Sequence, residues 1–330
     1  MCTLPAKCRE GDFYSHSINT PDIERSAVIF MKKSAMSRAL VRRETVAGYL
    51  FLLPSLFFFI TFVVYPMFMC VYNSFFDSNM GKNTKDVFIG LQNYVELFQD
   101  QIFLGALKNT FIIVVVSVPI VCAFSLWIAT VIYDMKPALT SAFRVIFYLP
   151  VVTGSVAVTV VWKWMYNNYY GIFNYLLKGA GIIDKNINWL GDSRFALGCI
   201  ILILLTTSVG QPIVLYVSAL GNVDKSLVEA AEVDGATRKQ VFWKIKWHQI
   251  MPTTLYILII TMINSFQCFA LIQLLTSGGP SHSTDTIMYY IYYTAFKLFR
   301  YGYGNAMGVI LMIIIAILSA IQFKLGNSKD

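Results

Sequence analysis

The stretch 222-NVDKSLVEAAEVDGATRKQVFWKIKWHQIMP-252 is the longest densely charged interruption in the apolar second half of the chain. Asp224 is well suited to cap the start of a helix, because its carboxylate can accept a hydrogen bond from a free backbone N–H of the first turn. From there Leu227 and Ala231 fall on one helical face. Gly235 follows where a left-handed residue commonly ends a helix. The first half of the stretch therefore predicts a short helix closed by a tight glycine turn.

A second helix is predicted directly after this turn. Thr237 and Gln240 have the capping-box spacing, in which the two residues satisfy each other's free backbone N–H groups. Pro252 is expected to begin the following helix, where its missing N–H costs nothing. The stretch thus predicts a helical hairpin between two apolar segments. An ordinary amphipathic hairpin on a membrane surface would show the same pattern, so these features alone leave its role open.

The composition is that of a membrane protein. The 330 residues are 57% hydrophobic and 13% charged, with a mean hydropathy of +0.61, whereas soluble domains carry about 25% charged residues. Apolar runs of about 20 residues recur, which is the length that crosses the hydrocarbon core of a bilayer. The alternating pattern of a membrane β-barrel is absent. The sequence therefore predicts an all-α integral membrane protein. The net charge of +8 fits membrane orientation better than nucleic-acid binding, because no nucleic-acid motif accompanies it.

Six transmembrane helices are predicted from the apolar runs. They cover about 47–72, 106–133, 144–165, 195–220, 253–275 and 304–323. Lys and Arg gather before the first run, in the hairpin and after the last run, so the positive-inside rule places the hairpin and both termini in the cytoplasm. The predicted organisation is a cytoplasmic tail over 1–46, a transmembrane domain over 47–323 that contains the hairpin 222–252, and a C-terminal tail over 324–330.

The N-terminal tail is polar and mixed, without the apolar core of a signal peptide. Met31 and Met36 each precede basic sequence that leads into the first apolar run. We therefore expect translation to begin at one of these, which would make residues 1–30 an upstream extension or a disordered tail.

In the first run, Pro54 and Pro66 are expected to kink the helix.

The hairpin resembles the EAA loop in permease subunits of ABC importers. In that loop Glu-Ala-Ala is followed after three residues by Gly, and after nine more by Ile-x-Leu-Pro. The matching residues are Glu229, Ala230, Ala231, Asp234, Gly235, Ala236 and Ile245. Trp247 and His248 stand where Leu and Pro are usual. In the family this loop docks into a groove on a cytoplasmic ATPase, so the resemblance implies that the matching residues couple the chain to such a partner.

The resemblance extends over about 47–323, with short motifs in the family's order such as Leu53-Pro54-Ser55, Asn109-Thr110 and Gly278-Gly279-Pro280. It implies the type I ABC-importer permease fold in a bacterial plasma membrane, in the compact branch that serves sugars and glycerol phosphate. It also implies a second permease subunit, two ATPase subunits, an extracellular solute-binding protein and a carbohydrate solute as partners, besides membrane lipid.

The chain itself contains no G-x-x-x-x-G-K-[ST] motif, so it is not expected to cradle nucleotide phosphates. ATP and Mg would be bound by the partner ATPases. We expect no cofactor, no metal and no catalytic residues in this chain, and no enzymatic activity of its own.

Polar side chains within the apolar runs are candidates for a solute path, because a polar group that faces lipid is costly. Asn264 and Gln267 lie three residues apart in the fifth run, one turn after Thr261. Gln211 closes a similar patch in the fourth run that begins at Thr207. Amide side chains both donate and accept hydrogen bonds, which suits hydroxyl-rich solutes. Hydrogen bonding between helices, which holds a bundle together, is the alternative role.

Other readings of the sequence have less support. An ion-coupled secondary transporter usually needs ionisable residues or broken helices at membrane depth, and the runs carry no Asp or Glu in their middles. An intramembrane enzyme would need a catalytic constellation there, and no His lies at that depth. The 278–280 turn could face a solute-binding protein or be a plain turn. We therefore predict the membrane subunit of an ATP-driven importer for a sugar or related polyol, with an ion-coupled transporter that lacks an ATPase partner as the alternative.

Overall fold

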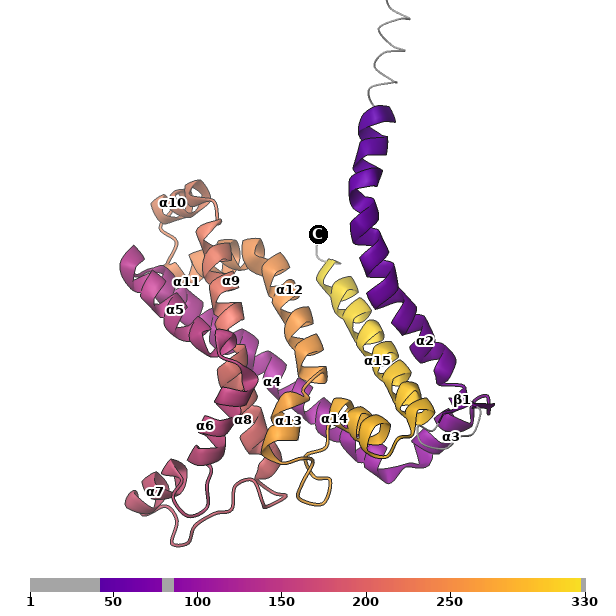
Figure 1. The fold of residues 1–330 in the computed structure, drawn as a ribbon. Helices are drawn as coiled ribbons and strands as arrows, with labels where there is room; N and C mark the ends of the chain where they lie inside the picture. Colours follow the sequence, from indigo (N-terminus) through magenta and orange to yellow (C-terminus); the bar gives the residue numbers. More distant parts are fainter. Residues whose placement is uncertain (1–41, 79–85, 328–330) are drawn as a thin grey trace, which may run out of the picture. The chain divides into compact units, whose positions relative to one another are not determined.

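A computed structural model describes residues 42–78 and 86–327. The expected start at Met31 or Met36 and the expected extension over 1–30 lie outside these residues. The chain divides into two compact units, Met1–Met67 and Phe68–Asp330, and the second of these contains all the features discussed below apart from the first helix (Figure 1).

The first helix runs from Arg42 to Asn73. It includes a π-helical turn, η1 (Ile60–Val64), followed by α2 (Tyr65–Asn73). The π turn lies just before Pro66, whose missing N–H leaves the carbonyl four residues earlier without its usual partner. A π turn is one way in which a long helix absorbs such an interruption. A widened turn thus precedes Pro66, while the kinks expected at Pro54 and Pro66 stay predictions.

The second unit is almost entirely helical. A two-stranded antiparallel ribbon pairs β1 (Phe76–Asp77) with β2 (Val87–Phe88), in the register Phe76↔Phe88. The helices are α3 (Gln92–Gln99), α4 (Gln101–Tyr133), α5 (Pro137–Val152), α6 (Ser155–Met165), α7 (Ile172–Gly179), α8 (Ala196–Ser208), α9 (Gly210–Gly221), α10 (Lys225–Val233), α11 (Arg238–Val241), η2 (Phe242–Lys246), α12 (Trp247–Phe266), α13 (Ala270–Leu275), α14 (Ile287–Tyr292), η3 (Tyr293–Lys297) and α15 (Tyr301–Asn327).

In the described part of the chain, five helices are long and apolar enough to cross a membrane, and a bent pair would make a sixth span. The bent pair is α5 and α6, which meet at 93°. The predicted third span, 144–165, thus corresponds to two helices with a sharp bend between them, and the bend was not predicted. Thr153 and Gly154 adopt extended backbone between the two helices, and the local sequence signal for the break, Pro150 followed by Thr153-Gly154-Ser155, was not used in the prediction.

The predicted role of Pro252 is also wrong, because this residue lies inside α12 and does not begin a helix. The second arm of the hairpin continues through η2 into α12, so the helical backbone is unbroken from Arg238 to Phe266. A proline within a membrane helix is tolerated when neighbouring groups or local adjustments satisfy the carbonyl that it frees. The fifth predicted span, 253–275, contains a further break at 267–269, between α12 and α13.

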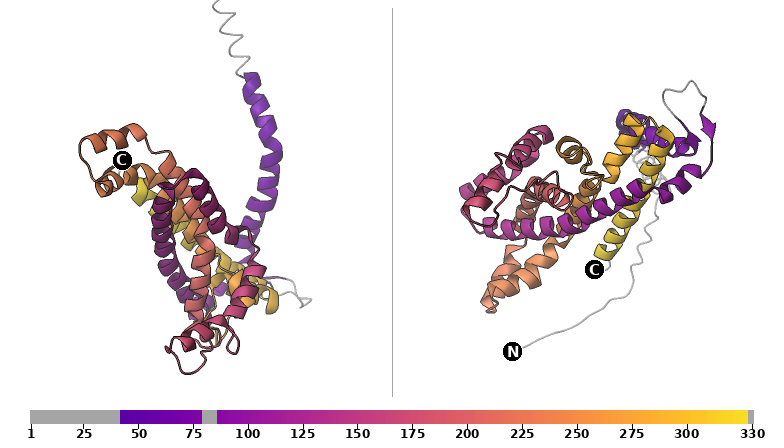
Figure 2. Two further views of the ribbon diagram at one scale, coloured as in Figure 1. Left: turned by 90° about the vertical axis from the view of Figure 1, so that its left-hand side faces the viewer. Right: turned by 90° about the horizontal axis from the view of Figure 1, so that it is seen from below.

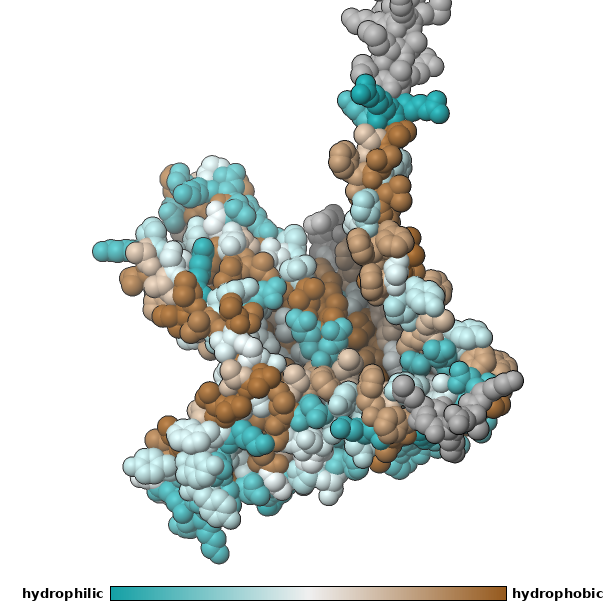
Figure 3. Space-filling view, viewed as in Figure 1, coloured by the Kyte–Doolittle hydropathy of each residue, from teal (hydrophilic) through white to brown (hydrophobic). Residues whose placement is uncertain are grey.

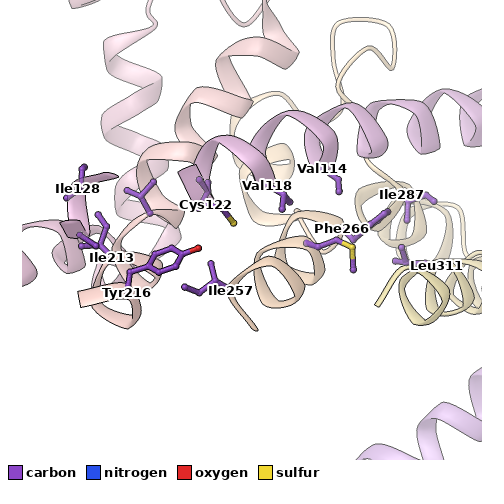
Figure 4. Close-up of a cluster of buried hydrophobic side chains, with 14 of the residues drawn as sticks. Val114, Val118, Cys122, Ile128, Ile213, Tyr216, Ile257, Phe266, Ile287 and Leu311 are labelled. Atoms are coloured by element: carbon purple, nitrogen blue, oxygen red, sulfur yellow. The ribbon is translucent and has the colours of Figure 1, made fainter. Parts of the chain in front are cut away.

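Helix α4 forms the centre of the second unit. It packs along α9 and α12 and also contacts α8 and α14. The view from below in Figure 2 shows it running across the other helices. Side chains on one face of α4, including Val114, Val118 and Cys122, meet Tyr216 of α9 and Phe266 of α12 in the main hydrophobic core (Figure 4). The core thus joins the helices that precede and follow the hairpin to a single long helix.

A carboxylate fastens the start of α4 to two later helices. Asp100 caps α4 by accepting hydrogen bonds from the backbone N–H groups of Ile102 and Phe103 at 2.8 and 3.3 Å. Its other oxygen accepts from the hydroxyls of Tyr290 in α14 and Tyr303 in α15, at 2.7 and 2.9 Å. Burial alone would raise the pKa of Asp100, but these four hydrogen bonds outweigh burial and lower it.

Replacing Asp100 by Asn should destabilise the fold by about 1.5–3 kcal/mol, because charge-assisted hydrogen bonds to two tyrosines become neutral ones while the helix cap is kept. The lowered pKa of Asp100 means that its stabilisation is present above the ordinary carboxyl pKa and is lost as the pH falls through the folded-state pKa below it. Thermal unfolding in detergent should therefore show a larger difference between wild type and variant at about pH 7 than at about pH 3. An equal difference at both pH values would show that the ionised carboxylate is not the stabilising group.

Candidate functional site

The predicted hairpin is present, and its first arm is α10 (Figure 1). Asp224 caps α10 by accepting hydrogen bonds from the backbone N–H and the hydroxyl of Ser226, at 2.9 and 2.8 Å. The hydrogen bonds to Ser226 lower the pKa of Asp224, so the cap is ionised at neutral pH. None of the residues of α10 is buried. In Figure 3, hydrophilic residues gather around α10 and again around α7, and hydrophobic residues predominate between these two helices.

Gly235 makes the turn, with φ of +80°. The backbone N–H of Gly235 donates to Glu232 O at 3.0 Å, and that of Ala236 donates to Ala231 O at 2.9 Å. This pair of hydrogen bonds is the Schellman arrangement, which satisfies the last carbonyls of a helix and needs a left-handed residue. The predicted glycine turn is therefore confirmed in its backbone geometry.

The second arm begins with the predicted capping box. The backbone N–H of Gln240 donates to Thr237 Oγ1 at 3.4 Å, and the Thr237 N–H donates to Gln240 Oε1 at 2.8 Å. The base of the hairpin is fastened to the bundle, because the Asp224 N–H donates to Gln249 Oε1 of α12 at 3.1 Å. In addition, the Lys246 ammonium lies 5.2 Å from the ring centroid of Tyr133, at the end of α4.

The two arms enclose a groove of about 360 Å³ on the hairpin. Of the seven residues predicted to couple to an ATPase, it brings five together as lining: Ala231, Asp234, Gly235, Ala236 and Ile245. Glu229 and Ala230 do not line it and are exposed on α10. The sequence reasoning missed Val233, which is 88% exposed in the last turn of α10. An apolar residue beside a Gly turn in a polar loop was the available signal.

A second candidate site is a cavity of about 130 Å³ inside the bundle. It lies where the end of α5, the junction of α8 with α9, and α12 meet. Its polar lining consists of Thr207, Ser208, Gln211, Thr261 and Asn264. The two polar patches singled out in the sequence therefore face one cavity. Gln267 is not part of the lining, since it is the first residue after α12.

Helix breaks position this cavity. Val209 separates α8 from α9, and α5 ends at Val152 just after the lining residue Val151. At Gly210 the backbone of α9 comes so close to α5 that an added Cβ would overlap the Phe147 carbonyl oxygen and lie 2.9 Å from Val151 Cγ2. The absence of a side chain at Gly210 thus sets the spacing of two cavity walls.

The polar lining retains unused hydrogen-bonding capacity. Within residues 42–78 and 86–327, the side chains of Ser208, Gln211, Thr261 and Asn264 make no hydrogen bond to the protein. The Thr207 hydroxyl donates to backbone carbonyls of its own helix, at 3.0 and 3.1 Å. The interhelical hydrogen bonds considered for Gln211 and Asn264 are therefore absent from the described structure, and these groups are available to a solute or to another chain.

The 277–286 loop at the other end of the unit is held by many hydrogen bonds. The Asn109 amide donates to Ser283 O and Asp285 O, both at 3.1 Å. His282 Nδ1 lies 2.6 Å from a buried carboxylate oxygen of Asp285. Burial raises the pKa of Asp285, although His282 acts in the opposite direction. The 278–280 turn is thus part of an ordered loop, with Ser281 and His282 exposed on it.

Residues 103–327 match the family described as "Binding-protein-dependent transport system inner membrane component". The chain is 34% identical over 301 residues to the probable ABC transporter permease protein YesP of Bacillus subtilis (strain 168), covering 90% of this chain and 94% of that protein. It is 31% identical over 294 residues to the lactose transport system permease protein LacF of Rhizobium radiobacter, covering 88% and 97%.

Among solved structures, the chain resembles one from a bacterial ABC transporter involved in the import of the acidic polysaccharide alginate. The TM-score is 0.75 at 23% identity, over 87% of this chain and 97% of that chain. At this level of identity the likeness shows a shared fold.

Proposed function

The chain belongs to the family of binding-protein-dependent transport system inner membrane components, and from this premise we propose that it forms one half of a solute path and couples that path to a separate ATPase. The family consists of transport permease subunits of ABC importers and not of enzymes, and it includes permeases for sugars. The chain is accordingly an inner-membrane component of a bacterial ABC importer.

The observation that carries the proposal is the hairpin α10–α11. Its turn is fixed by Gly235, its groove is lined by small residues and its arms are capped at both starts. Small residues at a turn allow another protein's surface to come close. We assign Glu229, Ala230 and the groove residues to contact with an ATP-binding subunit, with Val233 as an apolar anchor.

The solute path is assigned to the cavity between α5, α9 and α12. Its volume of about 130 Å³ is well below the roughly 300–1,000 Å³ of complete ligand pockets. We therefore infer that a second permease subunit supplies the remaining walls. Thr261, Asn264 and Gln211 would contact the solute there, as their free hydrogen-bonding groups allow. Gln267 lies beyond the end of α12 and is assigned to the outer part of the same path.

The proposed assembly contains a second permease subunit, two ATPase subunits that bind ATP and Mg, and an extracellular solute-binding protein. The proposed solute is a sugar, an oligosaccharide or a related polyol. ATP-driven closure of the ATPases would move the hairpin and open the cavity alternately to the two sides of the membrane. Both termini would be cytoplasmic, on the same side as the hairpin.

The test is uptake by the assembled importer in proteoliposomes. We expect a labelled saccharide to accumulate only when ATP is supplied on the hairpin side, and to do so after a protonophore has collapsed the proton gradient. The ATPase should also co-purify with this chain in mild detergent. Uptake that needs no ATP and stops with the proton gradient would instead establish the ion-coupled transporter considered above.

A further inference from the structure

The cavity between α5, α9 and α12 contains no charged side chain. Its polar lining consists of three hydroxyls and two amides, and its other lining residues are apolar. Hydroxyls and amides can both donate and accept hydrogen bonds, so they match the hydroxyls of a neutral polyol. They supply no formal charge to balance a carboxylate, phosphate or sulfonate.

The surrounding helices are almost free of charge as well. Across α5, α8, α9 and α12, Arg144 is the one residue among Lys, Arg, Asp and Glu. Arg144 lies seven residues before Val151 on α5, which places it about 10 Å further along the helix axis. Its Nε is buried and has no hydrogen-bond partner in the described residues. Arg144 is not among the residues that line the cavity.

Moving an ion into such a cavity is costly unless an opposite charge meets it there. A neutral hydroxyl-rich solute avoids this cost, because the lining can replace its hydrogen bonds to water one by one. The fold does not decide whether the solute is charged, since the solved transporter with the same fold is involved in the import of an acidic polysaccharide. The side chains that line the cavity of this chain do bear on that question.

We propose that the solute handled at this cavity is uncharged, and that Gln211 and Asn264 select it by hydrogen bonds alone. The inference rests on the proposed function and deepens it by naming the charge class of the solute. Gln211 is the most informative position, because its side chain is exposed into the cavity and makes no hydrogen bond within the described residues.

The experiment offers the complete importer, in proteoliposomes with its binding protein, a labelled mixture of neutral oligosaccharides, uronate oligosaccharides and polyol phosphates. Whichever solute accumulates with ATP is then used with the variants Gln211→Glu and Gln211→Lys. For an uncharged solute, both variants should lower uptake by about 10–100-fold, because each places a charge in the proposed solute path and loses half of the amide's hydrogen-bonding pattern. The two losses should agree to within about threefold.

An anionic solute would separate the two variants. Uptake would then fall with Gln211→Glu and be retained or raised with Gln211→Lys, and either that result or accumulation of a uronate or phosphate would overturn the inference. Arg144→Gln should leave the ratio of the two losses unchanged, and a shift in that ratio would show that Arg144 acts on the solute. Co-purification of the ATPase with each variant controls for folding.

Failure of the proposed function would look different. If no member of the mixture accumulates with ATP while the complex is intact, the proposed function of the cavity as a path for saccharides is wrong and the inference is wrong with it. If uptake is ATP-driven and the solute is anionic, only the inference is overturned.

Discussion

Replacing Gly235 by Trp should abolish ATP-driven uptake, with a loss of about 100-fold or more, because the residue forms the turn and lies in the proposed docking groove. The backbone at Gly235 has φ of +80°, a conformation that costs other L-residues about 1–2 kcal/mol. A Trp side chain would in addition occupy the space that an ATPase surface needs. The measurement is uptake by the reconstituted complex together with co-purification of the ATPase.

Two matched variants separate the backbone from the interface. A Cβ at Gly235 would meet nothing within 4 Å in this chain, so any steric effect must come from a partner. Gly235→Asn keeps access to the left-handed region and should retain most of the uptake. Gly235→Val strains the turn without adding an aromatic ring. Its loss of uptake should lie between the losses of the Asn and Trp variants. If Trp is as active as Asn, the turn does not face a partner.

Replacing Gly210 by Ala should destabilise the protein by about 1–3 kcal/mol, because the added methyl group overpacks a tight contact. Its Cβ would overlap the Phe147 carbonyl oxygen, a backbone atom that cannot rotate away. Helices α5 and α9 would have to separate, and the cavity between them would change shape. We expect a lower unfolding temperature in detergent. We also expect lower uptake by the complexes that remain folded, because the shape of the cavity changes.

Gly198→Ala is the matched control. Gly198 lies within α8, where an added Cβ would meet nothing within 4 Å. Ala is a better helix former than Gly by about 1 kcal/mol, so this variant should be neutral or slightly stabilising. Equal destabilisation by both changes would show that the contact between α5 and α9 does not carry the effect.

Local signals in the sequence were sufficient for the hairpin. Asp224, Gly235 and the Thr237–Gln240 pair act on backbone groups within a few residues of themselves, and the structure confirms each of them. Such interactions can be read from sequence because their partners lie within the same turn. Bringing Gln211 and Asn264 to one cavity required only that α9 and α12 pack together, which their place on either side of the hairpin favours.

The features that sequence reasoning missed depend on distant parts of the chain. Pro252 is such a case, because it lies in a helix that continues from the hairpin arm. The bend between α5 and α6 is the exception, because Pro150 and Thr153-Gly154-Ser155 mark it locally. Asp100 gains its role from Tyr290 and Tyr303, which lie 190 and 203 residues further along the chain. No pattern within one helix can reveal such partners, because only tertiary packing brings them together.

The unbroken helix from Arg238 to Phe266 has a mechanical consequence. One end of this rod, about 40 Å long at 1.5 Å per residue, is the second arm of the hairpin, and the other end carries Thr261 and Asn264 into the cavity. A rigid rod transmits a push at one end as a tilt at the other without needing a chain of intermediate contacts. The break at 267–269 lies just beyond the cavity-lining residue Asn264. Force applied at the membrane surface would thus reach the wall of the path as leverage.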